Sequence, residues 1–111
     1  MRENEGLDAR VPLRSTYADD EAIAEILPVF INNMPQYLSD LEARLGCNDY
    51  PGAARVCHDL KGTAGGYGFP DIGRAAADLE TEIKGKRDPG VIDAAFELVR
   101  SLCARARLGV H

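Results

Sequence analysis

Apolar residues recur every three or four positions along most of this chain of 111 residues. This is the spacing of one face of an α-helix, and it occurs in four stretches that begin near Asp19, Asp49, Pro70 and Pro89. Each stretch is amphipathic, so its apolar face must be buried against another helix. Because the connecting segments are short, the sequence predicts an all-α fold, an antiparallel four-helix bundle.

The first stretch contains two prolines, which complicate its prediction as a helix. Asp19 or Asp20 can cap its first turn by accepting hydrogen bonds from free backbone N–H groups. Pro28 can open a second segment, because proline is tolerated in a first helical turn, so we expect a short extra N-terminal helical segment. Pro35 should bend the helix rather than end it, since the apolar stripe continues across it, and Gly46 then ends it.

One domain with two short ends is expected. Residues 1–16 mix charge with glycine and proline and show no periodicity, which predicts a flexible leader. The helical domain is expected over residues 17–108, and residues 109–111 form a C-terminal tail. An apolar content of 45% is enough for one core in a chain of this length, and we find no internal repeat.

Charge and hydropathy exclude several classes of protein. A net charge of −5 argues against a general nucleic-acid binder and against a surface that sits on anionic lipid. No apolar run approaches the roughly 20 residues that span a bilayer, so no membrane insertion is expected. The first residues lack the apolar core of a signal peptide, and the three cysteines (Cys47, Cys57 and Cys103) contain no CxxC pair. Together these features predict a cytoplasmic protein with reduced thiols.

The most informative segment is AARVCHDLKGTAGGYG, residues 53–68. Advanced by about 100° per residue on a helix, its apolar side chains form one continuous stripe, and His58 points away from that stripe into solvent. The neighbours of His58 on this outer face are Ala54, Lys61, Gly62 and Gly65, all within about 60° of it. An exposed imidazole is therefore surrounded mainly by residues with almost no side chain.

Glycines inside a helix are costly. Gly62, Gly65 and Gly66 together forgo roughly 2–3 kcal/mol relative to alanine. The physical reason to accept this loss is access, because the backbone of another protein can then approach the imidazole closely. The alternative is that the glycines allow close contact between helices, but Gly62 and Gly65 lie on the side away from the apolar stripe.

The same residue types suit phosphoryl transfer. Imidazole is a nucleophile over much of the physiological pH range, because its reference pKa is about 6.5. Lys61 adds positive charge one turn from His58, where phosphate oxygens would collect. The solvent-facing ring nitrogen is then the expected nucleophile. The other nitrogen needs a hydrogen-bond acceptor, for which Glu80 on the next helix is a candidate.

The segment His58-Asp59-Leu60-Lys61-Gly62, followed by Gly68, resembles the H-x-L-K-G motif of histidine-containing phosphotransfer (HPt) domains. The run AGGYGFP, the following AAADLE and the upstream VFINNMPQYLSDLEARL also resemble HPt domains of hybrid sensor kinases. The resemblance covers residues 17–107. It implies a four-helix bundle that acts as a phosphocarrier rather than as a free-standing enzyme.

The resemblance also implies roles for individual residues. His58 matches the phosphorylated histidine, Lys61 the lysine near the phosphate and Gly62 the small residue that lets a partner approach. Glu80 falls where the family often has a Glu or Gln that reaches toward the ring. The surface expected to dock the partner comprises Ala54, Arg55, Asp59, Gly62 and Gly65.

The implied partners are receiver domains of response regulators, a hybrid histidine kinase, or both, and no small-molecule substrate is expected. The domain should hold no metal or cofactor, since the magnesium ion belongs to the receiver. Two alternatives stay open: a helical adaptor that binds receivers without being phosphorylated, and the phosphoacceptor domain of a chemotaxis-type kinase. A dyad of Cys57 and His58 is disfavoured, because adjacent helical side chains diverge by about 100°.

Overall fold

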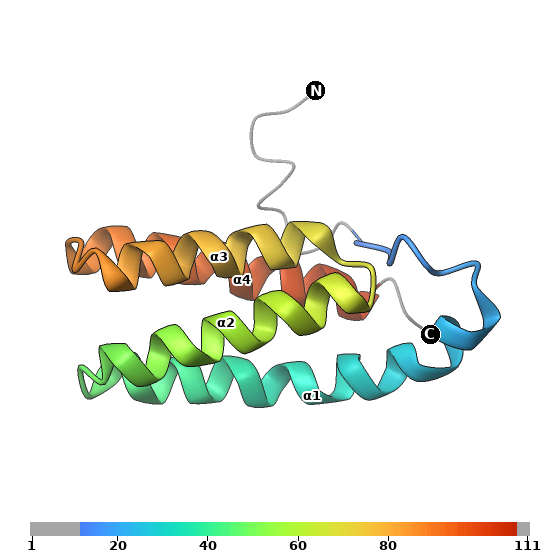
Figure 1. The fold of residues 1–111 in the computed structure, drawn as a ribbon, viewed down its shortest axis with the longest axis horizontal. Coiled ribbons are helices and arrows are strands. Elements are labelled where there is room, and N and C mark those ends of the chain that lie inside the picture. The colour runs from blue at the N-terminus through green and yellow to red at the C-terminus, as the bar shows by residue number, and fades with distance from the viewer. Residues whose placement is uncertain (1–11, 109–111) are drawn as a thin grey trace, which may run out of the picture.

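Helix boundaries in the structure follow the capping residues and glycines of the sequence. The computed structural model describes residues 12–108 and places four helices there, α1 (Glu21–Gly46), α2 (Tyr50–Gly66), α3 (Pro70–Lys84) and α4 (Pro89–Leu108) (Figure 1). The side chain of Asp20 caps α1, where it accepts hydrogen bonds from the N–H groups of Ala22 and Ile23. Asp49 caps α2 in the same way by accepting from the N–H of Gly52.

The prediction of a short extra helical segment before Pro28 is wrong. Residues 21–46 form one continuous helix that contains both Pro28 and Pro35. Each proline removes one backbone hydrogen bond, but both are exposed, so their rings do not disturb the packed side of the helix. The buried side chains on either side of Pro28, Leu27 and Phe30, hold the helix against the bundle across this position.

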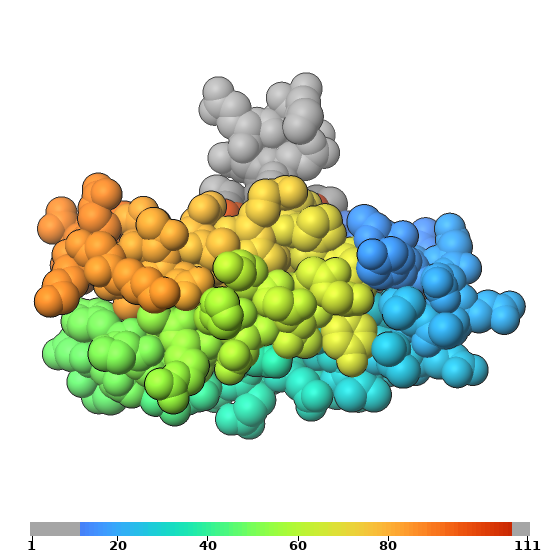
Figure 2. All heavy atoms as spheres, in the orientation of Figure 1, coloured from blue at the N-terminus to red at the C-terminus, as the bar shows by residue number. Residues whose placement is uncertain are grey.

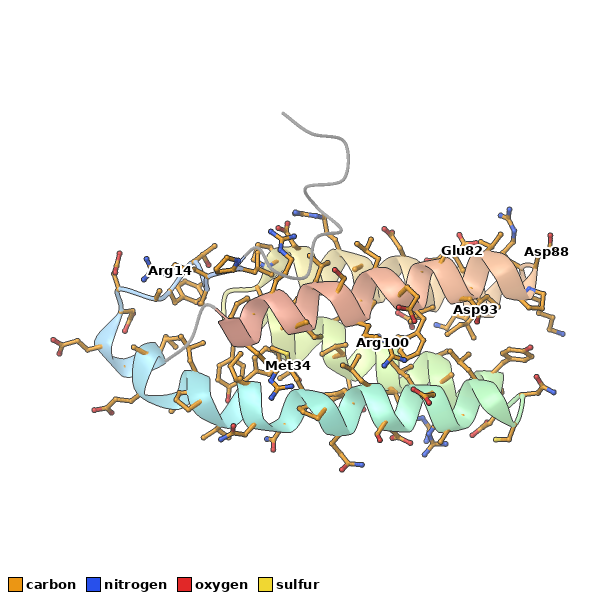
Figure 3. The ribbon with its side chains drawn as sticks, turned by 180° about the vertical axis from the view of Figure 1, so that it is seen from behind. Arg14, Met34, Glu82, Asp88, Asp93 and Arg100 are labelled. Atoms are coloured by element: carbon orange, nitrogen blue, oxygen red, sulfur yellow. The ribbon has the colours of Figure 1, made fainter. Side chains whose placement is uncertain are left out.

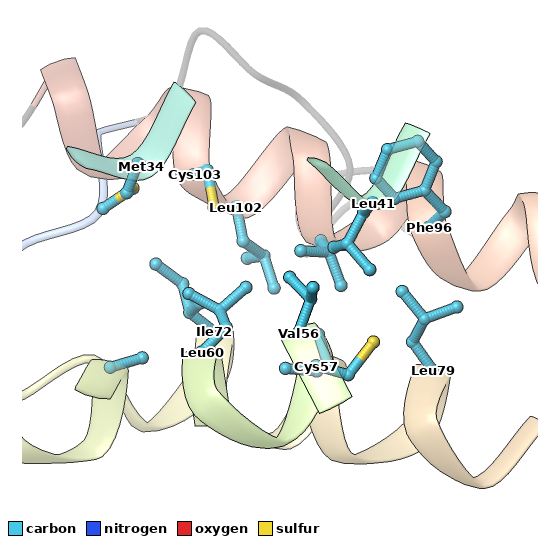
Figure 4. Packing of buried hydrophobic residues seen from close by; sticks show 14 of the residues in the cluster. Met34, Leu41, Val56, Cys57, Leu60, Ile72, Leu79, Phe96, Leu102 and Cys103 are labelled. Carbon is cyan, nitrogen blue, oxygen red and sulfur yellow. The ribbon is translucent and has the colours of Figure 1, made fainter. Parts of the chain in front are cut away.

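The all-α antiparallel bundle is confirmed. Consecutive helices run in opposite directions and pack side by side, and α4 also contacts α1, which closes the bundle (Figure 1). Residues from all four helices meet in one apolar core, in which α2 contributes Val56, Cys57 and Leu60 (Figure 4). From behind, Arg100 of α4 is seen reaching toward α1, where it forms an ion pair of 2.9 Å with Glu42 (Figure 3).

The last residues of the leader expected over residues 1–16 contact the bundle, so the prediction of a flexible segment is wrong for them. The N–H of Leu13 donates to the carbonyl of Arg105 on α4 at 2.8 Å, and the N–H of Thr16 donates to the carbonyl of Gly68 at 2.7 Å. Ser15 is buried, and its hydroxyl donates to the carbonyl of Tyr67. Residues 1–11 and the predicted tail over 109–111 lie outside the described residues.

Gly68 turns the chain between α2 and α3, and its replacement should destabilise the fold. Its φ of +83° is a conformation that favours glycine, and a Cβ there would collide with the side chains of Ser15, Thr16 and Tyr17. We expect Gly68→Ala to lower the free energy of unfolding by about 1–2 kcal/mol or more, as measured by urea denaturation.

The matched control is Gly66→Ala, since a Cβ at that position meets nothing within 4 Å. This variant should be neutral or more stable than the wild type, by up to about 1 kcal/mol. Equal effects of the two substitutions would contradict this explanation of Gly68.

Candidate functional site

His58 projects into solvent from the middle of α2. The opposite side of the helix is packed, with Ala53, Cys57 and Leu60 fully buried. The side chain of His58 is 64% exposed. The prediction that the imidazole lies on the outer face is therefore confirmed, and its chemical role stays a prediction at this point.

The three glycines near His58 do not serve helix packing. A Cβ placed on Gly62, Gly65 or Gly66 would meet nothing within 4 Å. The alternative of close contacts between helices is therefore wrong for these positions, and their glycines leave free space on the surface. Gly73 of α3, by contrast, faces α2, and a Cβ there would lie 3.4 Å from the carbonyl oxygen of Lys61, in van der Waals contact.

The prediction that Ala54 belongs to the exposed docking surface needs correction. Ala54 is buried, because α3 packs along the side of α2 that carries it. The other residues predicted for that surface, Arg55, Asp59, Gly62 and Gly65, are exposed, as is Lys61. The exposed residues of the predicted docking surface therefore include Gly62 and Asp59 but not Ala54.

α3 brings the carboxylate of Glu80 next to the ring of His58. Glu80 Oε2 lies 3.7 Å from His58 Nδ1, which is an electrostatic contact and too long for a hydrogen bond. The same oxygen forms an ion pair of 2.9 Å with Nζ of Lys84, one helical turn further along α3. Glu80 therefore lies beside the ring, as predicted, but it accepts its hydrogen bond from Lys84 rather than from His58.

Lys84 is a residue of the site that sequence reasoning missed. Its spacing of four residues from Glu80 is the signal that was available, because such pairs meet on one helix face. The hydrogen bond from Lys84 holds the pKa of the Glu80 carboxyl below its ordinary value, and the charges of Lys84, His58 and Lys61 act in the same direction. Burial opposes these effects, since the side chain of Glu80 is only 11% exposed.

An open pocket of about 720 Å³ lies between α2 and α3 beside the imidazole. Figure 2 shows the face of the molecule on which these two helices lie side by side. Most of the pocket surface is apolar, and several basic side chains border it; its lining includes Ala54, Arg55, His58, Ile83, Lys84 and Lys86. His58 thus faces free space toward this pocket as well as toward the glycines.

The thiol and the aromatic side chains near His58 in the sequence pack within the bundle and take no part in the site. Cys57 is fully buried, and burial raises the pKa of its thiol to about 12, so it forms no dyad with His58. Phe69 is buried, and Tyr67 stacks on Phe30 with ring centroids 4.9 Å apart. Both aromatic residues therefore contribute to packing at the turn between α2 and α3.

Within residues 12–108, no three His, Cys, Asp or Glu side chains are grouped in a way that could hold a metal ion. In the same range, none of the helices combines the length and apolar character that crossing a bilayer requires. The expectation that magnesium resides on a partner stays a prediction.

Comparison with known families identifies the fold and its general chemistry. The family model described as Hpt domain matches residues 25–108, which is most of the chain and includes all of α2 and α3. The chain belongs to the Hpt domain family. No curated protein and no solved structure gives a significant match.

Membership of this family supports a general function. Hpt domains carry out histidine phosphotransfer in two-component phosphorelays, where they interact with receiver domains and kinases. The exposed imidazole of this Hpt domain lies on the helix that carries the H-x-L-K-G motif. Family membership alone assigns the phosphoryl group to no particular residue.

The ion pair between Glu80 and Lys84 should make the free energy of unfolding depend on pH in the acid range. A carboxylate with a lowered folded-state pKa stabilises the fold above its unfolded-state pKa, and this contribution is lost as the pH falls through the folded-state value. We expect the difference in unfolding free energy between wild type and Glu80→Gln to be larger at neutral pH than at about pH 3.

Urea denaturation at several pH values measures this difference. Lys84→Met removes the main cause of the lowered pKa and should flatten the acid dependence in the same direction. If wild type and Glu80→Gln lose stability in parallel throughout the acid range, Glu80 does not contribute in this way.

Proposed function

We propose that His58 accepts a phosphoryl group from the phosphoaspartate of a receiver domain and passes it to a second receiver. The observation that carries this proposal is the 64% exposed imidazole beside glycines with free space around them, on the motif helix of an Hpt domain. An adaptor without phosphotransfer would need the open surface but not the nucleophile.

The transfer step follows from the orientation of the ring. With Nδ1 facing Glu80, the lone pair of Nε2 attacks phosphorus in line as the bond from phosphorus to the aspartate oxygen breaks. The electron pair of that bond leaves with the aspartate carboxylate. The ring keeps its proton on Nδ1, where the negative charge of Glu80 stabilises the cationic phosphoimidazole. The same step runs in reverse onto the next receiver.

The surroundings of His58 support this step. Lys61 is exposed one turn along α2 and brings positive charge to the side on which phosphoryl oxygens would lie. The space at Gly62 and Gly65 lets the receiver backbone approach the ring. Magnesium would lie with the receiver, where it offsets charge on the aspartyl phosphate.

Removal of the nucleophile tests the proposed function. Incubation with a phosphorylated receiver should label the wild type in a form that is acid-labile and alkali-stable, and His58→Gln should take up no label. Because His58 is exposed, the substitution should leave the helical circular dichroism unchanged. Label on His58→Gln would contradict the assignment, and stable binding of receivers without label on the wild type would favour the adaptor.

A side chain that fills the open surface should slow phosphoryl transfer without destabilising the fold. Gly62→Gln places a side chain in free space on an exposed helix, so it should stabilise the fold by about 0.5–1 kcal/mol. The same side chain should clash with a docked receiver and slow transfer by roughly tenfold or more.

Transfer rates and urea denaturation are measured on the same preparations. The matched control is Gly90→Gln on α4, which packs against α1 and α3 and also has free space around its glycine. Gly90→Gln should transfer at the wild-type rate. Wild-type transfer by Gly62→Gln would show that receivers do not dock over this surface.

A further inference from the structure

A second ammonium group, from α3, lies close to the imidazole. Lys84 Nζ is 2.9 Å from Glu80 Oε2, and the same oxygen is 3.7 Å from His58 Nδ1. Lys84 is therefore separated from the ring by a single carboxylate oxygen. Lys84 and His58 also line the same open pocket, into which the ammonium group can extend.

We propose that Lys84 is a second cation for the phosphoryl group, and that it exchanges partners when His58 is phosphorylated. The ammonium leaves Glu80 for the phosphoryl oxygens, and the freed carboxylate accepts a hydrogen bond from Nδ1–H of the ring. This inference rests on the proposed function, because it requires phosphorylation of His58. The exchange forms and breaks no covalent bond beyond the transfer step itself.

The relative charges favour this exchange. A phosphoryl group carries about −1.5 to −2 charges and has three acceptor oxygens, whereas the carboxylate has one charge. The lysine side chain is 65% exposed and has four rotatable methylene groups, so it can follow the stronger anion at little cost. The open pocket of about 720 Å³ provides the space for this movement.

In the proposed exchange Glu80 gains a hydrogen bond from the ring of His58. In the unphosphorylated protein its oxygen is committed to Lys84, which leaves the ring beyond hydrogen-bond distance. Once Lys84 has left, this nearly buried carboxylate needs a new partner, and the cationic phosphoimidazole presents Nδ1–H on the side that faces it. The phosphoryl group would then lie between Lys61 of α2 and Lys84 of α3.

Other basic residues of the pocket are placed differently. Lys86 follows the end of α3, and its backbone has a positive φ of 53°. Arg55 belongs to the predicted docking surface, and its charge acts on Asp49 at the start of α2. The ion pair with Glu80 is what distinguishes Lys84, and Lys86 serves as the control.

The experiment uses phosphoramidate, a small donor that transfers its phosphoryl group to histidine as its P–N bond breaks and ammonia leaves. The first readout is NMR of the lysine ε-positions and of phosphorus in the full chain. Phosphorylation should shift the signals of Lys84 but not those of Lys86. The phosphorus signal should change in Lys84→Met, stay near wild type in Lys84→Arg, and be unaffected in Lys86→Met.

The second readout is the equilibrium of label between the chain and a receiver that labels the wild type. Loss of one exposed cation should shift this equilibrium toward the receiver by about threefold in Lys84→Met. A purely structural role for Lys84 would alter stability without moving the phosphorus signal. An unchanged phosphorus signal and equilibrium in Lys84→Met, with His58 demonstrably phosphorylated, would overturn the inference and leave the proposed function standing. Absence of phosphohistidine in the wild type would overturn both.

Discussion

Burial of one face of α2 holds its other face in position. Leu60 and Cys57 are fully enclosed by the bundle, and burial of a side chain such as leucine contributes about 1.5–3 kcal/mol. This anchoring lets the helix carry Gly62 and Gly65 in the open, although each costs about 1 kcal/mol relative to alanine. A Cβ on either glycine would meet nothing within 4 Å, so the packing of the bundle does not require glycine at these positions.

The second helix of the site, α3, contributes the charged side chains beside the imidazole. It packs along α2, with Gly73 facing the backbone of Lys61, and this packing places Glu80 beside the imidazole. Lys84 then keeps the carboxylate ionised in a position from which most water is excluded. One side of the imidazole is thus open to a partner protein, and the other side faces the carboxylate of Glu80.

Much of this architecture is encoded locally and was predicted from the sequence. Asp20, Asp49 and Gly68 mark helix ends through their own hydrogen bonds and backbone preferences, so their positions follow from short segments. The exposure of His58 follows from the period of one helix. The predictions that failed depend on packing between elements. The burial of Ala54 requires knowing on which side α3 lies, and the helix continues through Pro28 because Leu27 and Phe30 are buried against the rest of the bundle.

The location of the phosphoryl group tests the central claim most directly. After transfer from a phosphorylated receiver, coupling between phosphorus and the imidazole nitrogens can be observed by NMR in the ¹⁵N-labelled chain. We predict that the phosphorus is bonded to Nε2 of His58, with the proton retained on Nδ1 beside Glu80. A phosphoryl group bonded to His111, to a hydroxyl or to a carboxylate of this chain would contradict the account.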